Sequence, residues 1–277
     1  MFPSWRARTL AEVAGALAAA GEHRQAATVA HQAATAARSI TNPDRQARAL
    51  AGVAGLLAAA GEHHQAATLA HQAATEARSS RGPDLQVEVM ARAAGVLAAA
   101  GEHRHAATMA HQAETVARSI LPLDMQAQAE AEVAGALAAA GEYHQAETVA
   151  FSIRHPYRRV QALARVAEAL AAAGEHGQAA TMAHQAETVA GSITSPDRQA
   201  GTLARIAEAL AKAGDTQSAR RAAAAACSMG DWLIAARPVL LLDPSAFAPT
   251  LARIRDGSGT VTFRNQQILS PDDHPHE

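Results

Sequence analysis

The sequence has a single cysteine, few aromatic residues and no large excess of charge of either sign. Cys227 has no second cysteine to pair with, which excludes an intrachain disulfide and fits a reducing compartment such as the cytoplasm. Aromatic residues make up 3% of the 277 residues, so the core is not built on large rings. The formal net charge of −2 gives no overall footprint for nucleic acid or an anionic membrane.

Motifs of catalysis and of membrane insertion are also missing from the sequence. It contains no Walker loop, no Gly-x-Ser-x-Gly nucleophile motif and no His-Glu-x-x-His zinc motif. The longest apolar runs are rich in alanine and interrupted by Gly-Glu, so we expect no membrane span. Residues 1–6 contain no apolar signal-peptide core. These absences predict a protein without enzymatic activity, cofactor or membrane contact.

What the chain does have is an internal repeat. The stretch from Leu17 to Ala33, LAAAGEHRQAATVAHQA, returns almost unchanged along most of the sequence. Each copy is marked by one glycine, and these are Gly21, Gly61, Gly101, Gly141, Gly174 and Gly214. The spacings between them are 40, 40, 40, 33 and 40 residues. A fixed period in this range predicts a solenoid of stacked helical hairpins.

Alignment on the marker glycine shows which positions packing would fix. Leucine always stands four residues before the glycine, and alanine stands seven before, five after and nine after it. Spacings of three and four place these residues on one face of each helix. The glycine itself is expected to end the first helix in the left-handed conformation. Asn42-Pro43-Asp44 and Ser195-Pro196-Asp197 carry the signals of helix starts.

The pattern Leu-x2-Val-Ala-x2-Leu-x3-Gly-x4-Ala-x3-Ala-x2-Ala, as in Leu163 to Ala186, resembles the tetratricopeptide repeat. The resemblance covers roughly residues 6–228 and implies helix pairs stacked into a right-handed superhelix with a concave groove. The chain departs from that family in having Leu or Ala at its aromatic positions. Most second helices are also about seven residues too long. We therefore expect an all-α, alanine-rich variant of this solenoid, with a HEAT-like relative as the alternative.

Six hairpins are predicted within an array covering residues 1–228. Their helices are expected at 6–20 and 22–38, 43–60 and 62–79, 84–100 and 102–119, 124–140 and 142–153, 157–173 and 175–191, and 197–213 and 215–228. Residues 229–256 are predicted to form two shorter capping helices over the last apolar face. Residues 257–277 are polar and predict a disordered tail.

The fourth repeat has lost seven residues from its second helix, which keeps the apolar face in phase within about 20°. Aromatic and basic side chains gather around this shortening, namely Tyr143, His144, Arg154, Tyr157, Arg158 and Arg159. One interpretation is a notch that anchors an acidic or aromatic partner segment. The alternative is that larger side chains fill the space of the lost turns. Glu130 replaces the Leu or Met of the other repeats and is expected to be solvated.

The groove implied by the resemblance changes character along the chain. At one first-helix position the first four repeats carry glycine, whereas the last two carry Glu168 and Glu208. The early groove is therefore expected to be smooth and the later part charged. Together with the six residues around the shortened helix, these two glutamates complete the predicted partner-binding set.

The fourteen histidines raise the question of a metal site. His31, His71, His111 and His184 each stand ten residues after a marker glycine. A metal site needs three or four converging ligands. Equivalent positions in stacked hairpins are separated by roughly 8–10 Å per helix contact. A ladder of equivalent histidines is therefore not expected to chelate an ion, and no metal site is predicted.

Three functional hypotheses follow. The first is a non-enzymatic interaction scaffold or docking arm that binds a protein or peptide around residues 128–168. The second is a structural solenoid that self-associates, because the repeats are near copies and the N-terminal face has little to cover it. The third is a nucleic-acid-binding solenoid, which would need a basic stripe that only Arg154, Arg158 and Arg159 begin to supply.

Overall fold

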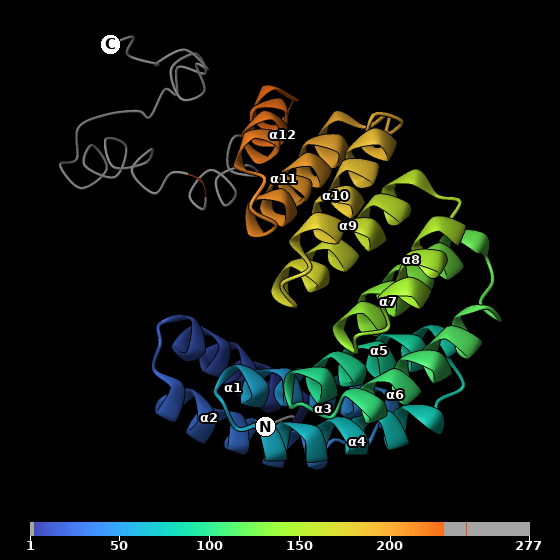
Figure 1. Cartoon of the computed structure of the whole chain (residues 1–277). Coiled ribbons are helices and arrows are strands. Elements are labelled where there is room, and N and C mark those ends of the chain that lie inside the picture. Colours follow the sequence, from blue (N-terminus) through green and yellow to red (C-terminus); the bar gives the residue numbers. More distant parts are fainter. Residues whose placement is uncertain (1–2, 230–241, 243–277) are drawn as a thin grey trace, which may run out of the picture. The chain divides into compact units, whose positions relative to one another are not determined.

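The computed structural model describes residues 3–229 and 242. These residues form twelve α-helices and no strand (Figure 1), which confirms the predicted all-α repeat architecture. None of the described helices has the length and apolar character needed to cross a bilayer. The predicted capping helices within 229–256 and the predicted tail at 257–277 lie outside the described residues, apart from Met229 and Leu242.

The helices are arranged as hairpins in two compact units, which divide the described residues between 154 and 155. The first unit holds α1 (Pro3–Ala19) with α2 (His23–Arg38), α3 (Pro43–Ala59) with α4 (His63–Arg78), α5 (Pro83–Ala99) with α6 (His103–Ala117), and α7 (Leu123–Ala139) with α8 (Tyr143–Ser152). In the second unit the hairpins are α9 (Pro156–Ala172) with α10 (His176–Ala190), and α11 (Pro196–Lys212) with α12 (Thr216–Met229). The predicted helix limits are met to within about one turn.

The marker glycines end the first helix of each hairpin as the sequence predicts. All six have positive φ, between 81° and 91°, where only glycine avoids a steric cost. In the first hairpin the Gly21 N–H donates to the Ala18 carbonyl at 3.0 Å, and the Glu22 N–H donates to the Leu17 carbonyl at 2.9 Å. These bonds satisfy carbonyls at the helix end. The same pair of bonds recurs at the other marker glycines and fixes the tight turn between the helices.

The predicted helix starts are only partly capped by side chains. Asn42 accepts a hydrogen bond from the Arg45 N–H at 2.9 Å, and Pro43 occupies the first turn of α3. Ser195 precedes Pro196 in the same way but makes no side-chain cap bond. Proline at the first position therefore recurs more regularly than the capping side chain does.

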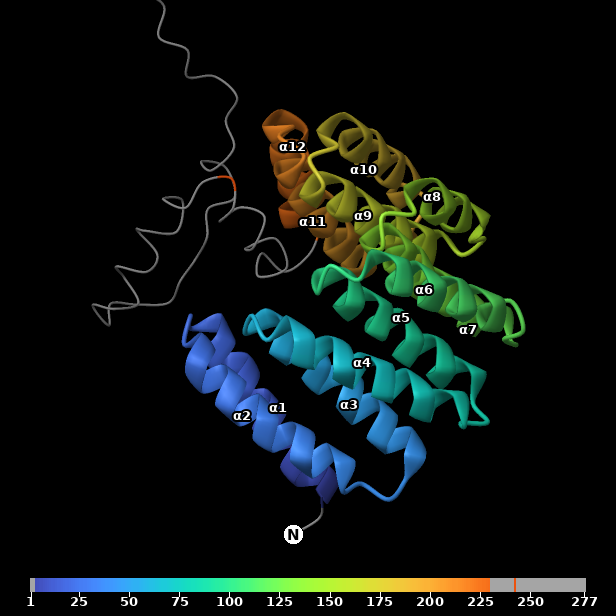
Figure 2. The same cartoon turned by 60° about the horizontal axis from the view of Figure 1, so that its bottom comes forward.

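Alanine and leucine build the core between hairpins. The leucines four residues before the marker glycines are at most 2% exposed in five of the six hairpins, and Leu17 of α1 is half-buried. The first helices pack directly on one another, α1 on α3, α3 on α5, α5 on α7 and, in the second unit, α9 on α11 (Figure 2). The second helices are joined by long polar side chains, since Arg38 donates to Gln72 and Arg78 donates to Gln112.

Replacement of Ala134 by Leu tests this packing. Ala134 of α7 has no exposed surface, so three added carbon atoms would force the neighbouring helices apart. We expect a loss of about 1–3 kcal/mol in the free energy of unfolding, measured by urea denaturation. Ala139→Leu, at an exposed position of the same helix, is the matched control and should leave stability nearly unchanged. Equal stability of both variants would contradict the assigned helix face.

Candidate partner-binding site

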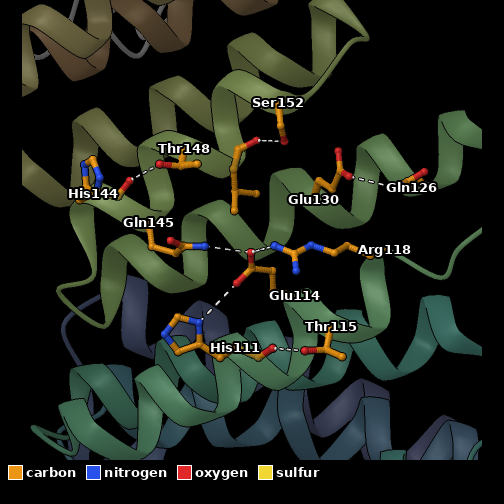
Figure 3. Close-up of polar contacts among 11 residues, drawn as sticks. His111, Glu114, Thr115, Arg118, Gln126, Glu130, His144, Gln145, Thr148 and Ser152 are labelled. Carbon is orange, nitrogen blue, oxygen red and sulfur yellow. Dashed lines mark hydrogen bonds and ion pairs between the residues drawn. The ribbon is translucent and has the colours of Figure 1, made fainter.

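A cavity lies at the shortened end of α8. This helix has 10 residues, whereas α2 and α4 each have 16. After Ser152 the backbone becomes extended at Ile153, whose side chain is fully buried, so the chain leaves the hairpin early. The cavity of about 270 Å³ is bounded by α6, α7 and α8. Its polar lining is formed by Glu114, Arg118, Glu130, Gln145, Thr148 and Ser152 (Figure 3).

Glu114 of α6 forms one ordered wall of the cavity. It is 7% exposed and takes the position of Ala34 and Ala74 in the first two hairpins. Its carboxylate accepts hydrogen bonds from Arg118 and from Gln145, the latter at 3.0 Å, and pairs with His111 Nδ1 at 3.3 Å (Figure 3). A buried carboxylate is costly unless its oxygens have such partners. Glu114 is therefore held in place by contacts within the first unit.

Glu130 of α7 forms the opposite wall and is less well partnered. It stands where Leu50 and Leu163, both 0% exposed, stand in other repeats. Gln126 donates a hydrogen bond to its carboxylate at 3.0 Å. Burial raises the pKa of Glu130, while the bond from Gln126 and the charge of Arg118 act in the opposite direction. Glu130 is thus half-buried instead of fully solvated, because it replaces a core residue at the edge of the cavity.

The predicted site residues of the first unit lie beside this cavity but do not line it. Tyr143 is the half-buried first residue of α8, and His144 and Arg154 are exposed. The His144 carbonyl accepts a bond from the Thr148 hydroxyl, which is a contact within the helix. Their exposure leaves His144 and Arg154 accessible to a partner.

The predicted residues of the second unit form a separate aromatic and cationic cluster. The guanidinium carbon of Arg158 lies 5.5 Å from the centre of the Tyr157 ring, within cation–π range. Arg198 of α11 lies at the same distance from this ring. Arg198 was not among the predicted site residues, although it stands 40 residues after Arg158 at the equivalent repeat position. Arg159 is half-buried in the first turn of α9.

The two predicted groove glutamates differ in their surroundings. Glu168 of α9 is half-buried, and its carboxylate lies 3.7 Å from the ammonium of Lys212 on α11. Glu208 of α11 is buried, with 8% of its surface exposed. The ion pair of Glu168 with Lys212 is therefore accessible to a partner, whereas Glu208 is not.

The raised pKa of Glu130 gives a testable pH dependence. A carboxyl whose folded pKa lies above its ordinary value of 4.5 contributes stability that is full at lower pH and lost as the pH rises through the folded pKa. Glu130→Gln removes the charge and should therefore stabilise the protein at about pH 7 but not below about pH 4. Urea unfolding of both proteins across this range measures the difference. A gain that is independent of pH would contradict the assignment.

No protein-family model matches the chain, and no curated protein matches it. Among solved structures it is similar to the TPR-like repeats of a Podosopora anserina protein assigned as a kinesin light chain, at 18% identity over 68% of this chain and 95% of that chain, with a TM-score of 0.47. A variant of the same protein is similar at 17% identity over 68% of this chain and 96% of that chain, with a TM-score of 0.49. BtubC from P. vanneervenii is similar at 15% identity over 96% of this chain and 99% of that chain, with a TM-score of 0.39.

Proposed function

We propose that the chain is a non-enzymatic interaction scaffold or docking arm whose partner inserts a side chain into the cavity at the end of α8. One observation carries this proposal. The hairpin that lacks the covering helical turns is also the hairpin in which Glu130 replaces a core leucine. A truncated helix alone would leave an apolar gap, and a glutamate alone would carry a burial cost. Together they make a polar recess of about 270 Å³ that is large enough for a long side chain.

The charges that line the recess favour the binding of a positively charged side chain. Glu114 already accepts hydrogen bonds from Arg118 and Gln145, whereas Glu130 accepts a hydrogen bond from the neutral Gln126. A lysine or arginine of the partner would pair with Glu130 and favour its ionised form. Pairs of this kind, desolvated at the centre of an interface, often dominate its energy. The partner class we propose is therefore a protein or peptide segment that presents a basic side chain.

Selection from a random peptide library, with the full chain as bait, tests this proposal. We expect the enriched peptides to share a lysine or arginine. Glu130→Leu, which restores the residue of four other repeats, should weaken their binding at least about 30-fold without unfolding the protein. Isothermal titration with the best peptide gives the affinities.

Two comparisons make the peptide experiment decisive. Glu76→Ala on α4, which introduces the residue of the first hairpin at that position, is the matched control and should bind like the wild type. A variant with Tyr157, Arg158 and Arg159 changed to Ala removes the cluster of the second unit. Binding lost only in this triple variant would contradict the cavity and place recognition at the cluster instead.

Self-association is a second candidate, favoured by the exposed face of α1. Val13 is 45% exposed, whereas Val53 and Val133 at the equivalent position are 1% and 0% exposed. Trp5 of the same helix is 53% exposed. This face of α1 therefore has the composition of a hairpin interface but is exposed. A second copy of the chain would supply a surface built from the same repeat.

Substitution of Val13 by Glu distinguishes self-association from a solitary scaffold. If copies stack through α1, the wild type should show a mass that rises with concentration in sedimentation equilibrium. Val13→Glu should remain monomeric, because a carboxylate would be buried without a partner at the contact. A wild type that stays monomeric at the highest concentration reached would remove this candidate.

A further inference from the structure

Three metal-ligating side chains converge where the second and third hairpins of the first unit meet. His71 belongs to α4, Glu102 directly precedes α6, and His105 lies in the first turn of α6. The Glu102 carboxylate lies 3.3 Å from His71 Nε2 and 3.0 Å from His105 Nδ1. One nitrogen of each ring and one carboxylate oxygen all lie within 4.8 Å of one another. The two rings pack edge to face, with centroids 5.5 Å apart.

The repeat explains why these residues meet. Equivalent histidines of successive hairpins are too far apart to share an ion, but non-equivalent positions face each other across the junction. Between the second and third hairpins, the histidine ten residues after one marker glycine lies beside the acid that follows the next marker glycine. The same juxtaposition occurs in the second unit, where His184 Nε2 lies 3.1 Å from the Asp215 carboxylate. This pairing of a histidine with a carboxylate thus occurs at two junctions between hairpins.

The third ligand distinguishes this junction from the others. Four residues after the marker glycine, the repeats carry Gln25, Gln65, Gln145 and Gln178, and the last carries Ser218. His105 alone is an imidazole at this position. Within the described part of the chain, His71, Glu102 and His105 are also the one group of three such ligands with this spacing. A single Gln-to-His difference therefore adds a third metal-ligating side chain, His105, to the contact between His71 and Glu102.

We propose that His71, Glu102 and His105 bind a divalent transition-metal ion, with Zn²⁺ as the favoured occupant. At zinc–ligand distances of about 2.0–2.1 Å, tetrahedral ligand atoms lie about 3.3 Å apart. The two contacts of Glu102, at 3.3 and 3.0 Å, already have this separation. Two imidazoles and one carboxylate are a ligand set used by zinc, and imidazole is a poor donor for Mg²⁺ or Ca²⁺.

Binding requires only local changes at the junction. Each imidazole would present a lone pair to the ion where it now faces Glu102, and the ion would replace the two hydrogen bonds. Three protein ligands leave one tetrahedral position for water or a partner side chain. The ion would also join α4 to α6 across the hairpin junction.

Zinc titration of the full chain, freed of metal by chelation, tests the site. Competition with a chromophoric chelator should give one tight equivalent in the wild type. His105→Gln, the residue of four other repeats, and His71→Gln should each weaken it by about 100-fold or more. His103→Gln changes an exposed histidine of the same helix and should bind like the wild type. Co²⁺ should give tetrahedral absorption bands in the wild type that His105→Gln loses.

The thermal midpoint provides an independent readout. An ion that binds only the folded state raises the midpoint of unfolding. Added Zn²⁺ should therefore raise it in the wild type and in His103→Gln, and leave His105→Gln unchanged. Zinc affinity and midpoint shift that are the same in His105→Gln and the wild type would overturn the proposal, as would the absence of a stoichiometric equivalent in the wild type.

Discussion

Close packing through alanine is the constraint on which the rest of this structure depends. The alanine seven residues before each marker glycine, from Ala14 to Ala207, has no exposed surface in any of the six hairpins. A methyl group at this position allows helices to approach closely and to gain many short contacts. Larger side chains are excluded there, so the differences between repeats stand at other positions. Departures from the repeat are therefore the informative part of the sequence, and Glu114, Glu130 and His105 are such departures.

Most of the fold could be predicted because it depends on local patterns. The glycine turn, the helix limits and the buried leucines follow from spacing and from the conformational freedom of glycine. The cavity could be predicted only in part. Glu130 and the shortened helix were evident, but Glu114 joins them from the preceding hairpin, through a contact between α6 and α8. The junction of His71 with Glu102 was missed because it pairs non-equivalent positions, 31 residues apart.

The cavity beside Glu130 and the proposed metal site at His105 differ in their effect on the stability of the fold. Glu130 occupies a place that leucine fills in the other hairpins, and its raised pKa reflects the burial of a charge. The cavity is thus formed at the expense of core packing, a frequent feature of binding sites. His105 replaces an exposed glutamine and disturbs no buried group. A site of this kind can be gained or lost by one substitution while the stack is retained.

The 33-residue spacing of the fourth repeat also has a consequence for folding. The second helices α2, α4 and α6 are so alike that one could dock in the place of another with little loss of contact energy. Such exchange produces misassembled and domain-swapped species in proteins with similar repeats. The α7–α8 hairpin cannot be exchanged in this way, because α8 is shorter and Ile153 is buried immediately after it. One irregular hairpin in a series of near copies therefore gives the chain a fixed reference point for correct assembly.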